Sequence, residues 1–103
     1  MKIIIPLFKD RISPHFSTAP EALLVQTEDT GSISTWKIDL TLLSLPERKA
    51  RILALGIDVI CCGGIDRVTR SWFEKKGIRV EENCMGNAME MFDGRLREID
   101  PSV

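Results

Sequence analysis

One histidine and a pair of cysteines are the side chains of this sequence best suited to bind a metal. His15 is the only histidine, and a neutral imidazole is a common ligand for iron, copper and zinc. The alternative is a hydrogen-bonded surface histidine. Cys61 and Cys62 are adjacent, so on a strand they point to opposite faces and cannot hold one metal together. We expect Cys61 to be an inert core thiol on the face it shares with Ile57 and Val59. Cys62, at the strand end, is the better candidate for a reactive thiolate.

Two glycines directly after these cysteines are placed to let an anion approach the backbone. Gly63 and Gly64 lead straight into a predicted helix, whose first N–H groups and positive dipole end can face an anion. Four basic side chains lie in the first turn of that helix or on a neighbouring loop: Lys9, Arg11, Arg67 and Arg70. This crowding of cations favours an anionic ligand. Nucleotides are disfavoured, because the sequence has no Walker or G-x-G-x-x-G pattern.

The remaining reactive side chains are better explained by packing. Only three carboxylates fall near the predicted site, Asp10, Asp58 and Asp66, which is thin support for a two-metal nuclease. Cys84 is most simply a packing residue. Met85, Ala88, Met89 and Phe92 recur at helical spacing, so they predict the core-facing side of a last helix that ends at Gly94.

The elements that must position these residues alternate as in an α/β protein. Apolar runs predict strands at 3–5, 22–27, 32–38, 57–62 and 78–80, with Gly31 in the turn of a hairpin. A capping box from Ser44 to Glu47 predicts a helix over 45–55. A second helix is predicted over 66–76 and ends before Gly77. On that helix Trp72 is expected to face the sheet, with Ile65, Thr69 and Phe73.

The order of these elements predicts a mixed sheet and places a binding site on it. The β-β-β-α-β-α-β-α order opens with antiparallel strands and continues with right-handed βαβ units, which need parallel strands. If the first strand is central, the chain changes direction beside it. Ligands of open α/β sheets bind at such switch points, outside the carboxyl ends of the flanking strands. The polar loop 9–20 and the segment 61–64 therefore converge on one predicted site. The loop has little apolar anchoring, so we expect it to be mobile without ligand.

Length and charge define the broad class of protein. The 103 residues (11.6 kDa) suit one domain, 1–103. A net charge of −1 removes the attraction that non-specific nucleic-acid binding needs. Three cysteines do not make a disulfide framework, which indicates a reducing, cytoplasmic environment. The apolar start is too short for a signal peptide or a membrane span, so no membrane partner is expected.

Five short blocks occur in an order specific to one family. They are MKIIIP at 1–6, SPHF at 13–16 followed by AP at 19–20, GIDVICCGGI at 56–65, GIRV at 77–80 and NAME at 87–90. Over nearly the whole chain they resemble the dinitrogenase iron-molybdenum cofactor-binding family. Two positions depart from the family pattern, because Ser17 and Asp66 stand where relatives usually have glycine. The resemblance implies a ribonuclease H-like α/β fold, which we expect as a mixed five-stranded sheet with three helices.

The family includes nitrogenase cofactor carriers and small proteins that hold a molybdenum-copper sulfide cluster. The resemblance therefore implies binding of an anionic metal-sulfur cluster, of iron-molybdenum or molybdenum-copper type, with His15 as the metal ligand. The expected cofactor-binding residues are His15, Phe16, Cys62, Gly63, Gly64, Arg67 and Arg11.

We expect a small carrier or scaffold, not an enzyme, whose partners are cluster-donating and cluster-receiving proteins. The alternative, favoured by Asp66, is a regulatory or interaction module of the same fold without a cluster. A nuclease, suggested by the fold type, is the third reading.

Overall fold

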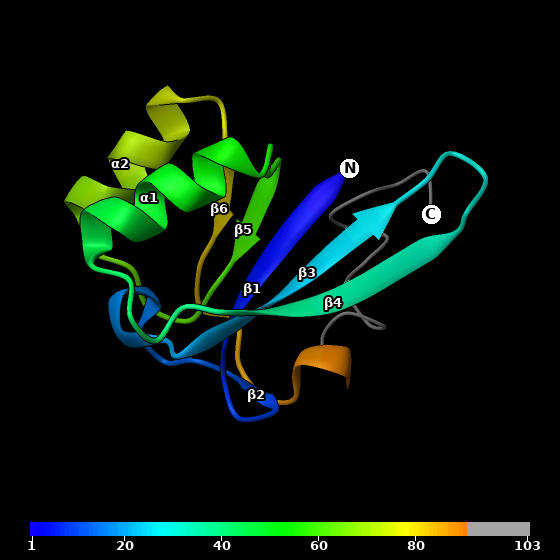
Figure 1. The fold of residues 1–103 in the computed structure, drawn as a ribbon, viewed down its shortest axis with the longest axis horizontal. Coiled ribbons are helices and arrows are strands. Elements are labelled where there is room, and N and C mark those ends of the chain that lie inside the picture. The colour runs from blue at the N-terminus through cyan, green and yellow to red at the C-terminus, as the bar shows by residue number, and fades with distance from the viewer. Residues whose placement is uncertain (91–103) are drawn as a thin grey trace.

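The computed structural model describes residues 1–90 of the chain (Figure 1). Its strands are β1 (Lys2–Phe8), β2 (Arg11–Ile12), β3 (Glu21–Thr27), β4 (Ile33–Asp39), β5 (Val59–Cys61) and β6 (Arg79–Glu81). Its helical elements are a 3₁₀ turn, η1 (Phe16–Thr18), and two helices, α1 (Leu45–Ala54) and α2 (Arg67–Lys75). Ala88–Glu90 are also helical. Most predicted elements are thus confirmed within a residue or two. The predicted continuation of the last helix to Gly94 lies outside the described residues.

The sheet is mixed and open, as predicted, with β1 at its centre. The strand order is β4-β3-β1-β5-β6, and the short β2 pairs with β1 off this path. β1 runs antiparallel to β3 and parallel to β5, so the change of direction falls beside it. The sheet therefore has six strands and not five. The extra strand pairs only two residues, Arg11 and Ile12, with the end of β1, which is too short a run to show in an apolar pattern.

Each face of the sheet carries its own apolar core, which explains the continuous apolar run of β1. Ile3 and Ile5 belong to one cluster with Val59 and Cys61, whereas Ile4 belongs to the other, which includes Ile52 of α1 and Phe73 of α2. Both helices lie on the same side of the sheet (Figure 1). Cys61 thus shares a face with Val59 as expected. Ile57 does not, because it lies before β5 begins and packs in the helix-side cluster.

The two helices start at side-chain caps. At α1 the Ser44 hydroxyl accepts a hydrogen bond from the Glu47 N–H, and the Glu47 carboxylate accepts one from the Ser44 N–H, so the predicted capping box is confirmed.

On α2 the buried side chains are Thr69 and Phe73. Trp72 is only partly buried and lies on the flank of the helix, but it packs against the edge of the helix-side core, so its expected place on the sheet-facing side is confirmed only in part.

The predicted methionine core is also wrong. Met85 is 78% exposed and precedes the helical residues, and Met89 is 48% exposed. Ala88 is buried, as the helical pattern requires. The helix begins three residues later than the pattern suggested, because Gly86 adopts a positive φ of 92° and breaks the regular backbone. Among residues 1–90 no helix is long and apolar enough to cross a membrane.

Candidate functional site

The structure brings the histidine loop against the glycine turn, as the topology predicted. His15 and Gly64 form an isolated parallel bridge. The Gly64 N–H donates to the Pro14 carbonyl (2.7 Å), and the Phe16 N–H donates to the Gly64 carbonyl (2.9 Å). These bonds join the segments that follow β1 and β5, which are neighbouring parallel strands. The predicted site at the carboxyl ends of these strands is therefore a physical contact between backbones.

The two glycines are needed for this contact. A Cβ atom on Gly63 would lie 2.6 Å from the Ser13 carbonyl oxygen, and one on Gly64 would lie 2.9 Å from the Pro14 oxygen. Both distances are too short for a real side chain, so the loop can approach only a bare backbone. The space left by the missing side chains is filled by the protein itself. The glycines position His15 and do not form an open cradle for an anion.

A small cavity of about 330 Å³ opens beside this contact. The residues lining this His15 cavity are His15, Phe16, Ser17, Gly64, Ile65 and Asp66. The Phe16 side chain is buried and meets the ring of Phe73 edge to face, with centroids 5.6 Å apart. His15, in contrast, is exposed. One face of the loop thus anchors in the core while the imidazole remains accessible to a ligand.

The loop is anchored more firmly than its composition suggested. The Ser13 side chain is buried, and its hydroxyl donates to the His15 carbonyl (3.0 Å). The buried Arg48 of α1 donates to the carbonyls of Phe16 and Ala19 on the loop and of Leu40 beyond β4. Burial lowers the pKa of the Arg48 guanidinium below its usual value. Sequence reasoning missed Arg48, since an arginine in an amphipathic helix has no local signal that marks it as buried.

The positive end of α2 is already occupied by a carboxylate. Asp66 caps the helix, accepting from the Thr69 N–H (2.9 Å) and the Thr69 hydroxyl (2.6 Å). These two hydrogen bonds, the side-chain bond first, lower the pKa of Asp66 below its usual range. A charged carboxylate therefore lines the cavity in which an anionic ligand was expected.

Cys62 does not have the surroundings of a reactive thiolate, which its place at the strand end had suggested. Its side chain is fully buried. Burial raises the pKa of the Cys62 thiol to about 12, with smaller contributions from Cys84 and Glu82. The residue packs in the helix-side core and does not line the His15 cavity. Cys84 is buried in the other cluster, which confirms its interpretation as a packing residue.

The basic side chains do not gather at the His15 cavity. Arg70 forms ion pairs with Glu74 (2.9 Å) and Glu82 (2.7 Å). Arg11 lies in β2, where it pairs with Phe8 of β1, and it forms a bridge with Asn87. Arg67 is exposed on the first turn of α2, next to the cavity but outside its lining. Of the predicted site residues, His15, Phe16, Gly63 and Gly64 lie together, whereas Arg11, Cys62 and Arg67 do not join them.

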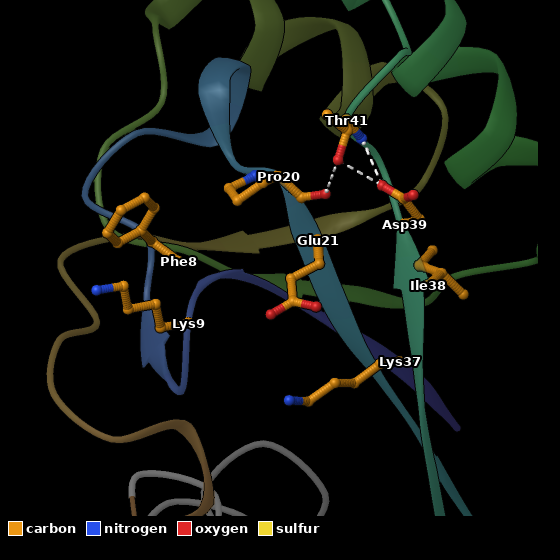
Figure 2. Close-up of a pocket in the computed structure, with 8 residues that line it drawn as sticks. All are labelled: Phe8, Lys9, Pro20, Glu21, Lys37, Ile38, Asp39 and Thr41. Carbon is orange, nitrogen blue, oxygen red and sulfur yellow. Dashed lines mark hydrogen bonds between the residues drawn. The ribbon is translucent and has the colours of Figure 1, made fainter.

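Lys9 belongs to a second cavity, of about 520 Å³, at the ends of β1, β3 and β4 (Figure 2). Lys9 and Lys37 lie there with Glu21 and Asp39, so charges of both signs line it. Asp39 is held by the Thr41 hydroxyl (2.6 Å) and N–H (2.8 Å). The balance of charges gives this cavity no preference for an anion.

No group of three or more histidine, cysteine, aspartate or glutamate side chains within residues 1–90 is arranged to hold a metal ion. A metal bound in the His15 cavity would have the imidazole as its one nitrogen ligand from the described chain.

Solved structures share this fold. No family model and no curated protein matches the chain. The structure named PH0822 is similar over 87% of this chain and 83% of its own, with a TM-score of 0.79 at 20% identity. A protein of Methanocaldococcus jannaschii, provisionally described as a dinitrogenase, matches over 97% and 90%, with a TM-score of 0.69 at 22% identity. The apo form of the orange protein of Desulfovibrio gigas matches over 99% and 89%, with a TM-score of 0.66 at 20% identity.

Proposed function

We propose that this protein is a small carrier or scaffold for an anionic metal-sulfur cluster, which it holds as cargo. The observation that carries the proposal is the contact between His15 and Gly64, which fixes an exposed imidazole at the switch point of the sheet. The fold, shared with a protein described as a dinitrogenase and with the orange protein, supports it. We accordingly propose membership of the dinitrogenase iron-molybdenum cofactor-binding family, with its ribonuclease H-like fold, as one domain over 1–103.

A single protein ligand suits cargo that must leave again. His15 would bind one metal of the cluster, and the buried thiols of Cys62 and Cys84 would not compete, because they lie in the core. The Asp66 carboxylate lines the same cavity and repels an anion. Both features weaken binding, which favours exchange with other proteins over permanent retention.

This reading extends to the protein's role in the cell. We propose that it is not an enzyme, that it acts in the cytoplasm, and that its partners are cluster-donating and cluster-receiving proteins. The cargo would be of iron-molybdenum or molybdenum-copper type.

The second candidate is a regulatory or interaction module that has kept the fold without a cluster. Asp66 favours it. Its carboxylate occupies the N-terminus of α2 through two hydrogen bonds to Thr69, where an anionic ligand would otherwise interact with the helix dipole.

Anaerobic titration with tetrathiomolybdate, with and without copper(I), separates the two readings. The carrier reading predicts saturable uptake by the wild type, followed by absorbance, and loss of most of it in His15→Ala. Asp66→Asn removes the negative charge while asparagine still caps the helix, so it should bind more tightly than the wild type. Asp10→Asn is the matched control, since Asp10 is exposed and does not line the cavity. No uptake by any variant would favour the interaction module, and equal uptake by all four would overturn the site.

A further inference from the structure

One flank of α2 combines an apolar surface with basic side chains. Arg67, Val68, Ser71, Trp72 and Lys75 line a groove of about 420 Å³, here called the Trp72 groove. The spacing of Val68, Ser71, Trp72 and Lys75 is i, i+3, i+4 and i+7, which places them on one face of the helix. The core-facing side is taken by Thr69 and Phe73. Apart from the inner side of Trp72, which packs against the helix-side core, the groove is a surface that the core does not use.

The apolar part of the groove is open to solvent. Val68, in the first turn of α2, is 76% exposed. Trp72 is held in place from below, because its ring meets Phe73 edge to face with centroids 5.2 Å apart. A concave surface with a fixed aromatic wall is suited to accept an apolar side chain of a partner, since ordering the indole then costs little further entropy.

The rim of the groove is basic. The Nζ atoms of Lys49 and Lys76 lie 5.1 and 5.4 Å from the Trp72 ring centroid. With Arg67 and Lys75 they surround the apolar centre, and within residues 1–90 none of the four forms an ion pair. The acidic side chain of α2, Glu74, lies on the opposite flank and pairs with Arg70. The net charge of the whole chain is −1, so this positive rim is a local feature.

We propose that the Trp72 groove is a docking surface for an acidic protein segment, in which glutamates or aspartates flank an apolar anchor side chain. The anchor would fill the groove between Val68 and Trp72, and the partner's carboxylates would pair with the four surrounding cations. The groove begins at Arg67, and the neighbouring Asp66 lines the His15 cavity. A docked partner would therefore lie beside the imidazole. The docking surface itself does not depend on cluster binding.

A synthetic peptide tests this without any cargo. The probe is an amphipathic helical peptide with leucine anchors flanked by glutamates, and its counterpart has lysines in place of the glutamates. Trp72 fluorescence reports binding in a Trp36→Phe background, which removes the other tryptophan. We expect saturable binding of the acidic peptide alone, weakening as salt rises. The double variant Arg67→Glu/Lys75→Glu should weaken it at least about tenfold.

Matched variants locate the contact. Val68→Asp should abolish binding, whereas Leu42→Asp, at an apolar residue 92% exposed and outside the groove, should leave it unchanged. Urea unfolding of both variants checks that they remain folded. Equal binding of the two peptides, no binding of either, or equal loss in both aspartate variants would overturn the proposal. Binding to vesicles of anionic lipid but not to the acidic peptide would also overturn it, in favour of a membrane surface.

Discussion

The His15 cavity and the Trp72 groove meet at the start of α2 but differ in how their polar groups are used. At the cavity, the Gly64 N–H, the Ser13 hydroxyl and the Asp66 carboxylate all bond within the protein. At the groove, Arg67 and Lys75 form no ion pair with any residue of the described part of the chain. The cavity is thus a rigid setting for one accessible imidazole, and the groove is a surface whose charges can still pair with a partner. The helix α2 therefore borders both a rigid site and a surface whose charges are available to a partner.

The largest expected effect tests the division of α2 into a core side and a groove side. Phe73→Ala should lower the free energy of unfolding by about 3–5 kcal/mol, because its fully buried ring leaves a cavity. Trp72→Ala should cost only about 1–2 kcal/mol, since the indole is only partly buried at the edge of the core, and the variant loses that burial and two cation–π contacts. Urea unfolding of both variants measures this difference. Equal losses would show that the two residues share one environment.

Arg48→Met tests whether the histidine loop depends on buried polar contacts. Methionine keeps the apolar stem but removes the donors to the carbonyls of Ala19 and Leu40. The Leu40 carbonyl keeps the Leu43 N–H as a donor, but loss of the Arg48 donors should still cost about 2–3 kcal/mol of unfolding free energy. Amide exchange of residues 13–19 should rise in the same variant. Arg51→Met, on an exposed position of the same helix, is the control and should change neither quantity.

Gly63→Ala tests the close approach of the loop to the glycine turn. The new Cβ would lie 2.6 Å from the Ser13 carbonyl, so the loop must shift, at a cost of about 1–3 kcal/mol. Gly31→Asn is the control: Gly31 has a positive φ, which asparagine tolerates, and open space around it. Its urea midpoint should stay near that of the wild type. A Gly63→Ala protein of wild-type stability would mean that the backbones are not in contact.

The smallest effect concerns the Asp66 carboxylate, which lines the His15 cavity next to the start of the Trp72 groove. Hydrogen bonds from Thr69 lower the pKa of Asp66 in the folded state. The stability that it contributes is therefore present above the unfolded pKa of about 3.9 and is lost as pH falls through the lower folded value. Wild type should lose slightly more stability than Asp66→Asn between pH 5 and about 2. Unfolding midpoints measured across this range, with the Asp66 carboxyl followed by NMR, check the sign. Identical pH profiles would contradict it.

Much of the fold could be predicted because its signals are local. The hairpin around Gly31, the capping box at Ser44 and the apolar run of β1 each depend on residues close in sequence. The meeting of His15 with Gly64 also followed, from the rule that ligand sites lie at switch points. This contact is long-range, but the topology that creates it is built from local elements.

The features that could not be predicted depend on contacts between distant segments. Cys62 is a strand-end residue by its pattern, but it is buried in a core that includes Phe16 and Phe73, and its backbone bonds to Glu81 of β6 and to Cys84. Arg48 can be buried because four separate carbonyl groups accept its hydrogen bonds. Most of the residues that contact Cys62 and Arg48 are distant in sequence, so neighbouring residues do not reveal them.

The central place of β1 has a consequence for how the chain folds during synthesis. β1 can pair with β3, and β3 with β4, once somewhat more than the first third of the chain has emerged. Apart from the two residues that pair with β2, the other edge of β1 is covered only by β5, after Val59 and Ile60 arrive. Until then a largely apolar strand exposes most of an unpaired edge, the kind of template on which chains aggregate. The ribosome-bound chain is therefore most vulnerable while the segment between β4 and β5 is being made.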